Sequence, residues 1–123
     1  MRKSLLECSD EELLGIVGDY ALRLEYGSEP PSDKEQCEAG RWWFDAQINK
    51  HKGAICRHPF VAALLVRSEV DAPLALGFAI ALVIELGIFQ RPASETSEHI
   101  AAFSTLLVRS VMSGFCSNQS QAN

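Results

Sequence analysis

Residues 72–89 read APLALGFAIALVIELGIF, and this stretch decides the fold. It is apolar on every side of a helix, and only Pro73 near its start and the carboxylate of Glu85 interrupt it. A helix that is hydrophobic all round must be enclosed by protein or by lipid. The other helical stretches are amphipathic, so we expect residues 72–90 to form the central helix of an all-α bundle. Arg91-Pro92 should end this helix.

The same stretch lies at the lower edge of the length that a membrane span requires, ~18–20 apolar residues. Glu85 within it would cost about 2–3 kcal/mol at bilayer depth. No polybasic flank or interfacial tryptophan accompanies it. These features favour a buried core helix over a transmembrane helix.

Four further helices, which would make about five in all, are expected from their start signals. In the first, Ser9 and Glu12 have the spacing of a capping box, in which each side chain bonds the other residue's backbone N–H. Ser32 and Glu35 repeat this spacing at the start of the second helix.

Pro59 suits the first turn of a third helix, and Ser94 suits the cap of the last one. Residues 54–58 are expected to form a linker, because the residue before a proline disfavours helical backbone angles. Residues 1–116 then form a single helical domain. The polar residues 117–123 (SNQSQAN) are expected to form a disordered tail.

Composition suits a small soluble protein. The chain has 123 residues and a net charge of −5, which disfavours nonspecific nucleic-acid binding. Only Leu5 and Leu6 follow the basic residues at the N-terminus, too few for the apolar core of a signal peptide, so a cytoplasmic location is expected. The four cysteines contain no CxxC pair, and in that compartment we expect free thiols.

Charge is uneven along the chain. Residues 7–38 contain ten acids and two bases, a net charge of −8, whereas residues 39–67 contain five bases and one acid, a net charge of +4. The basic turn around residues 50–58 could hold an anion or a partner. Ordinary solvated surface charge is the simpler reading, because a local excess of charge rarely marks a site.

Trp42, Trp43 and Phe44 place three large rings in succession. Successive helical residues point about 100° apart, so at least one ring should lie at the rim of the domain or in an interface. Tryptophan is enriched at binding hot spots. The partner-binding surface expected from these features consists of Arg41, Trp42, Trp43, Lys50, Lys52 and Arg57.

Glu85 is the residue most open to a functional interpretation. A carboxylate in an apolar helix is paired, hydrogen-bonded or placed in a pocket. A structural ion pair with Arg91 or Arg67, where the helix emerges, is the first expectation, and simple exposure to solvent is a further alternative. The alternative is a ligand pocket anchored by Glu85 and walled by three aromatic side chains, those of Tyr20, Trp43 and Phe103.

No metal or cofactor is expected. His51, Cys56 and His58 lack the close pairs that are typical of zinc sites. The group of Glu95, Glu98 and His99 also departs from the Glu-x-x-His unit of helical di-iron proteins.

The sequence contains no nucleophile elbow, phosphate loop or dinucleotide-binding glycine pattern, so catalysis is not expected. We predict a protein that acts through macromolecular interaction, such as a regulator, an adaptor or an immunity-type module. Small residues four apart in 72–90 (Ala75 with Ala79, Gly77 with Ala81) would let a second copy approach, so a homodimer is expected. The alternative function is a small-molecule-binding or enzymatic bundle with the Glu85 pocket. Neither nucleic acid nor a membrane is an expected partner.

Overall fold

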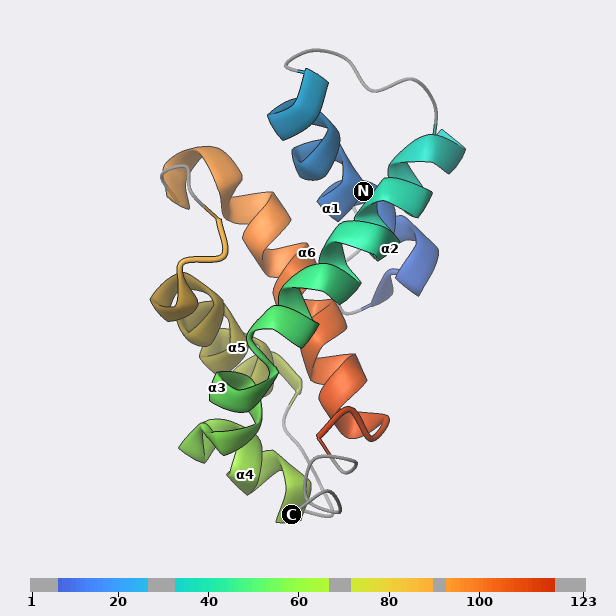
Figure 1. The fold of residues 1–123 in the computed structure, drawn as a ribbon. Helices are drawn as coiled ribbons and strands as arrows, with labels where there is room; N and C mark the ends of the chain where they lie inside the picture. Colours follow the sequence, from blue (N-terminus) through green and yellow to red (C-terminus); the bar gives the residue numbers. More distant parts are fainter. Residues whose placement is uncertain (1–6, 27–32, 67–71, 90–92, 117–123) are drawn as a thin grey trace.

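The computed structural model describes residues 7–26, 33–66, 72–89 and 93–116, and these ranges contain helices and no strand. The all-α prediction is confirmed, with one helix more than expected (Figure 1). Ser32 and residues 117–123 lie outside the described residues. The six helices are α1 (Asp10–Tyr26), α2 (Asp33–Lys50), α3 (Lys52–Arg57), α4 (Pro59–Val66), α5 (Ala72–Leu86) and α6 (Ala93–Met112).

The capping box predicted at the start of α1 is confirmed. The backbone N–H of Glu12 donates to Ser9 Oγ at 3.2 Å, and the backbone N–H of Ser9 donates to Glu12 Oε1 at 3.1 Å. Two backbone donors at the helix N-terminus thereby gain acceptors.

Replacing Ser9 with alanine is expected to lower the free energy of unfolding by about 1 kcal/mol, the usual effect of losing an N-cap. Urea denaturation followed by circular dichroism measures this change. Ser113, which lies beyond the end of α6, supplies a control. If Ser9→Ala and Ser113→Ala change stability equally, the cap contributes nothing.

The linker predicted over residues 54–58 is wrong, because residues 52–57 form α3. The break that Pro59 imposes is confined to one residue, His58, whose ψ of 136° is extended. His58 also caps the next helix, since its Nδ1 accepts a hydrogen bond from the backbone N–H of Phe60 at 3.2 Å.

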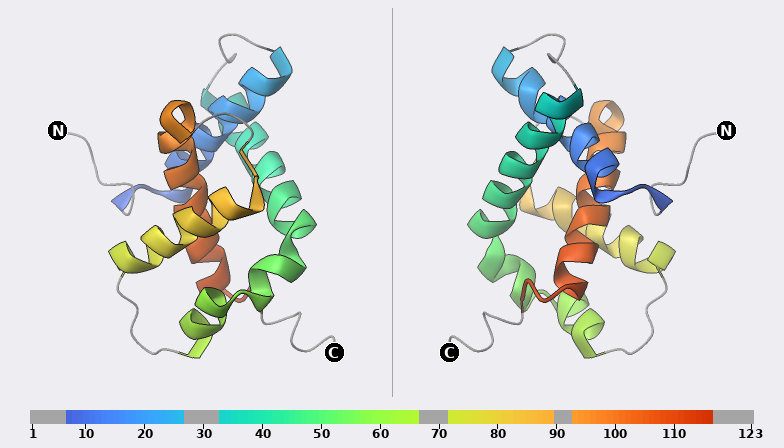
Figure 2. Two further views of the ribbon diagram at one scale, coloured as in Figure 1. Left: turned by 90° about the vertical axis from the view of Figure 1, so that its left-hand side faces the viewer. Right: turned by 90° about the vertical axis from the view of Figure 1, so that its right-hand side faces the viewer.

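The core is centred on α6, which packs against α1, α4 and α5. Figures 1 and 2 show α6 running through the middle of the molecule, with α1 and α2 crossing at one end and α3 and α4 at the other. Residues 102–107 are all buried, and such a run covers every side of a helix. The prediction that residues 72–90 form the central helix is therefore wrong.

Helix α5 instead lies on the outside of the bundle and buries only one stripe. Ala75, Ala79, Leu82 and Val83 are buried, whereas the opposite side of the helix faces solvent along its length. It also ends at Leu86, before the predicted stop at 91–92. Gly87 has φ of +68°, a conformation that favours glycine, and its N–H donates to the carbonyl of Ile84 at 3.1 Å.

Helices α1 and α2 cross in direct backbone contact. A Cβ atom placed on Gly18 would lie 1.7 Å from the carbonyl oxygen of Gln36, and one on Gly40 would lie 1.9 Å from that of Leu14. Only glycine permits this approach, so the two glycines fix how α1 and α2 pack.

Two long-range links hold the ends of the fold together. Arg109 Nη1 donates to Asp10 Oδ1 at 2.7 Å, and its Nη2 donates to the carbonyl of Cys8 at 2.8 Å, which joins α6 to the start of α1. A disulfide joins Cys56 of α3 to Cys116, just after α6. The expectation of four free thiols is therefore wrong for this pair.

No helix in the described ranges is long and apolar enough to cross a membrane.

Candidate functional site

Aromatic side chains from four segments meet between α1, α2 and α6. The ring of Trp43 lies 5.4 Å from Tyr20, 5.3 Å from Phe89 and 5.7 Å from Phe103, measured between centroids. Phe44 packs on Phe103 at 4.8 Å. Three of the four residues predicted to form a pocket, Tyr20, Trp43 and Phe103, are thus brought together.

This aromatic cluster is tied to α6 on its other side by a polar contact. His99 Nε2 lies 3.0 Å from Asp19 Oδ2, and both side chains are mostly buried. The His99 ring also lies 5.6 Å from the Tyr20 ring. The position of Tyr20 is therefore fixed from both sides, and the wall that it forms is rigid.

A small pocket of ≈ 210 Å³ opens beside this cluster, where α1, α2 and the end of α5 converge. Phe103 does not line it, because that side chain is fully buried beneath. The lining residues of α2 lie on one side of the helix, because Gln47 follows Trp43 by four positions and Lys50 follows Gln47 by three. The described residues that line it are Tyr20, Trp43, Gln47, Lys50, His51, Leu86, Gly87 and Ile88.

Glu85 does not line this pocket, so the alternative in which it anchors the pocket is wrong. Its side chain is 69% exposed, and its Oε2 lies 3.6 Å from His58 Nε2. The physical reason is the outer position of α5, which leaves one side of this helix to solvent. The expected partners Arg67 and Arg91 lie outside the described residues.

The three consecutive rings of α2 divide as their 100° spacing predicts. Trp42 is 73% exposed, Trp43 is half-buried in the cluster, and Phe44 is buried. Arg41 is exposed beside Trp42. The pair of Arg41 and Trp42 therefore forms an outer surface of α2, whereas Trp43 and Lys50 belong to the pocket.

The other two cations predicted to bind a partner make contacts within the chain. Lys52 Nζ lies 5.2 Å from the centroid of the Phe115 ring, a cation–π contact beside the Cys56–Cys116 disulfide. Arg57 Nε donates to the carbonyl of Gly53 at 3.0 Å. Each of these two cations is therefore already engaged within the chain.

Three of the five exposed large hydrophobic side chains among the described residues lie on α5. Leu74, Phe78 and Ile84 are each about half-exposed. Gly77 and Ala81 are exposed between them. We call these five residues the α5 outer face.

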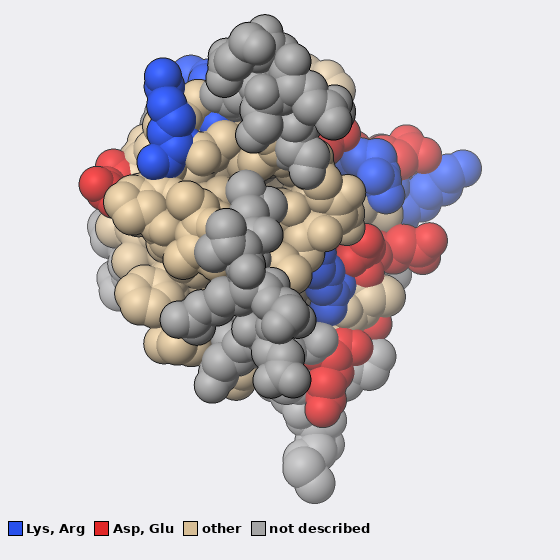
Figure 3. Space-filling view, turned by 90° about the horizontal axis from the view of Figure 1, so that it is seen from below, with Lys and Arg blue, Asp and Glu red and all other residues tan. Residues whose placement is uncertain are grey.

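The α5 outer face continues onto α4. Phe78 stacks on Phe60 of α4 at 5.4 Å between centroids. At the α3–α4 end of the molecule, uncharged residues form most of the described surface, with Lys, Arg, Asp and Glu mainly at its edges (Figure 3).

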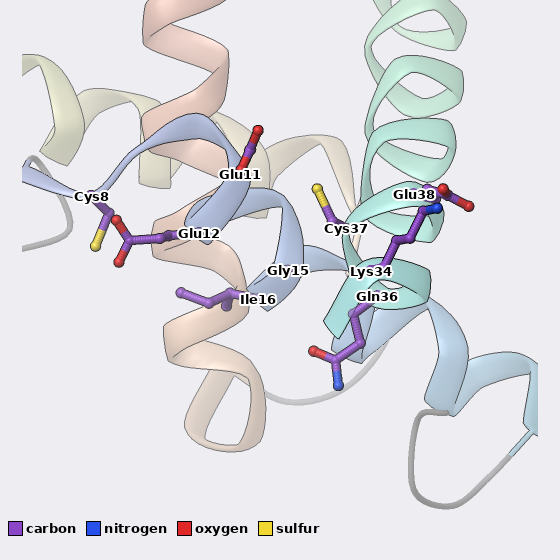
Figure 4. Close-up of a pocket in the computed structure, with 9 residues that line it drawn as sticks. All are labelled: Cys8, Glu11, Glu12, Gly15, Ile16, Lys34, Gln36, Cys37 and Glu38. Atoms are coloured by element: carbon purple, nitrogen blue, oxygen red, sulfur yellow. The ribbon is translucent and has the colours of Figure 1, made fainter. Parts of the chain in front are cut away.

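A wider groove of ≈ 740 Å³ separates the first turns of α1 and α2 (Figure 4). Its walls carry three glutamates, Glu11, Glu12 and Glu38, together with the thiol-bearing residues Cys8 and Cys37. Sequence reasoning did not identify this groove, because no motif connects residues 8–16 with 34–38. Glu12 is already engaged in the capping box, and the mixed charges indicate no particular ligand.

The residues considered as metal ligands are not assembled into a site. Cys56 is bonded to Cys116, and His58 caps α4 and lies near Glu85. Within the described ranges no three His, Cys, Asp or Glu side chains are placed to hold one ion.

The pocket beside the aromatic cluster, the α5 outer face and the exposed pair of Arg41 and Trp42 are the features with functional potential. Sequence reasoning found the aromatic walls of the pocket but missed Gln47, His51 and Gly87, which have no distinguishing pattern. Comparison with models of protein families, with curated proteins and with solved structures gives no match for this chain.

Proposed function

We propose that this chain is a non-catalytic interaction module whose α5 outer face binds a second copy of the chain. The exposure of Leu74, Phe78 and Ile84 on one side of a single helix carries the proposal. Single apolar side chains on a surface are ordinary, but a contiguous apolar stripe marks an interaction site.

The pattern of side-chain sizes on the α5 outer face favours a second copy as the occupant. Large residues stand at positions 74 and 84, and small residues stand at 77 and 81. In an antiparallel pair centred on position 79, Leu74 would contact Ile84 of the second copy at each end of the face, and Gly77 would lie opposite Ala81, where small side chains let the helices approach. A twofold dimer requires this self-complementarity and is the commonest form of oligomer.

Charge also favours the antiparallel arrangement. Glu85 is the charged residue adjacent to the face, and it lies at one end. In an antiparallel pair centred on position 79, the two Glu85 residues are about 18 Å apart along the helix axes, from a rise of 1.5 Å per residue. In a parallel pair the two carboxylates would lie opposite each other and repel.

Replacing Phe78 with glutamate should raise the dimer dissociation constant at least tenfold. An unpaired carboxylate in the centre of an apolar interface loses its hydration without gaining a partner. Sedimentation velocity over a range of protein concentrations measures the constant. Because Phe78 also stacks on Phe60, Ile84→Glu provides a second variant without that ring contact.

Met112→Glu is the matched control, because Met112 is 50% exposed, close to the 51% of Phe78, but belongs to α6. This variant should dimerise like the parent protein, as should Trp42→Ala. A parent protein that sediments as a monomer at about 100 μM would contradict the proposal. Equal weakening by Phe78→Glu and Met112→Glu would also contradict it.

A further protein partner is proposed for the surface formed by Arg41 and Trp42. The 73% exposure of Trp42 supports this assignment, because tryptophan and arginine are the residue types most enriched among binding hot spots. This surface would leave the α5 outer face available for the dimer, which suits a regulator or an adaptor.

The sequence predicts a cytoplasmic location from its N-terminus, and free thiols were expected to follow from that location. The Cys56–Cys116 disulfide instead favours an oxidising compartment, because disulfides persist there and are rare in the cytosol. Trapping thiols in cells with an alkylating reagent before lysis tests this inference, since cytosolic protein would be modified at four cysteines.

A further inference from the structure

The pocket beside the aromatic cluster contains polar side chains without protein partners. The side chains of Gln47, Lys50 and His51 line it, and none of the three forms a hydrogen bond or ion pair with another described residue. Three unengaged polar groups that converge on one cavity are typical of a ligand site.

The chemistry of this lining selects an anion. Lys50 supplies a positive charge and up to three donors, Gln47 supplies an amide N–H₂, and His51 supplies a ring N–H. None of the eight described lining residues is Asp or Glu. Charge-assisted hydrogen bonds from such donors to a carboxylate or phosphate are the strong ones.

The size and rigidity of the pocket limit the ligand. Its volume of ≈ 210 Å³ is below the roughly 300–1,000 Å³ of drug-sized sites, so it fits a small molecule or one group of a larger one. Trp43 and Tyr20 form one wall, and their rings are held by Phe89 at 5.3 and 4.6 Å. The site is therefore formed before a ligand arrives.

We propose that this pocket binds the carboxylate or phosphate group of a small anionic molecule, with Lys50 as the charged contact and Gln47 and His51 as further donors. The apolar part of the ligand would then lie against Trp43 and Leu86. This site does not depend on the proposed dimer, because no residue of the α5 outer face lines the pocket.

Tryptophan fluorescence can report binding directly. In the Trp42→Phe variant, Trp43 is the sole tryptophan, and it lines the pocket. Titration with inorganic phosphate and, separately, with acetate should give a saturable change in its emission, whereas sodium chloride at the same ionic strength should not. Saturation by one anion alone identifies which group the site takes.

Lys50→Gln in this background should weaken binding at least tenfold, because the charged donor is lost. Arg41→Gln is the matched control, since it removes one exposed positive charge from the same helix but does not line the pocket. The proposal is overturned if neither anion gives saturation. Equal weakening by both variants would also overturn it, since the effect would then be one of net charge.

Discussion

Replacing Gly18 or Gly40 with alanine is expected to lower the free energy of unfolding by about 2 kcal/mol or more. At each position the added Cβ would overlap a backbone carbonyl, that of Gln36 at 1.7 Å or that of Leu14 at 1.9 Å. Backbone atoms cannot move aside as a flexible side chain can, so α1 and α2 must separate. Overpacking of this kind costs about 3 kcal/mol or more, and the better helix propensity of alanine returns about 1 kcal/mol.

Gly15 provides the matched control, because it lies on α1 one turn before Gly18 and a Cβ there would meet nothing within 4 Å. Gly15→Ala should therefore stabilise the protein by about 0.5–1 kcal/mol through helix propensity alone. Urea denaturation of the three variants measures these opposite signs. If all three changes stabilise the protein, the close crossing of α1 and α2 does not exist.

The sequence predicts where most helices begin but not which of them lies at the centre. Ser9, Glu12 and Pro59 act on their own backbone neighbourhood, so they can be recognised without tertiary information. The central position of α6 depends on neighbours instead. Its buried Thr105 satisfies its own hydroxyl by donating to the carbonyl of Ala101 at 2.8 Å, so a polar residue there is no sign of exposure.

Mean hydropathy was a poor guide to burial for the same reason. The stretch 72–89 is the longest apolar run of the chain, yet Leu74, Phe78 and Ile84 are about half-exposed on α5. An apolar helix surface can be covered by its own chain or by another molecule. Burial within one chain measures only the first kind of cover. Under the dimer proposal, a second copy covers the α5 outer face.

The candidate site was predictable in part. The aromatic walls Tyr20 and Trp43 stand out by residue type, but Phe103 is buried beneath the pocket, and the polar group predicted to accompany these rings was the wrong one. Glu85 was predicted as the polar group of the pocket because it is a lone acid among apolar residues. Lys50 and Gln47 have no such local signal, and their position in the pocket follows from their shared stripe with Trp43 and from the fold.

The crossing glycines show a similar limit. Small residues were identified as contact points in 72–90, where pairs four apart lie on one helix. Gly18 and Gly40 are on different helices and 22 positions apart, so no spacing connects them. The available signal was that glycine within a helix is unfavourable by roughly 0.5–1 kcal/mol and needs a structural reason.

The cysteines could not be paired from spacing either, because Cys56 and Cys116 are separated by 60 residues. Only the packing of α3 against the end of α6 brings them together, with a Cα–Cα distance of 5.4 Å. Cys8 and Cys37 are not part of a disulfide. In denaturant, the oxidised protein should therefore show two reactive thiols, and the reduced protein should show four.

Reduction of this disulfide is expected to lower the free energy of unfolding by about 4 kcal/mol, the value that the chain-entropy model gives for a loop of this length. The double variant Cys56→Ser, Cys116→Ser should be destabilised to a similar extent and should no longer respond to dithiothreitol. Cys37→Ser is the control, because it removes a thiol and leaves the disulfide intact. Unfolding in urea with and without dithiothreitol measures each change.

Two outcomes would contradict this prediction. Four thiols that react without reductant would mean that the bond is absent, and an unfolding midpoint unaffected by dithiothreitol would mean that it contributes no stability.

A loss of stability confined to the disulfide-linked region would also be visible, because Lys52 and Phe115 pack together beside the bond. Hydrogen exchange should then increase first in α3 and in the last turn of α6, while the amides near the Gly18–Gly40 crossing remain protected.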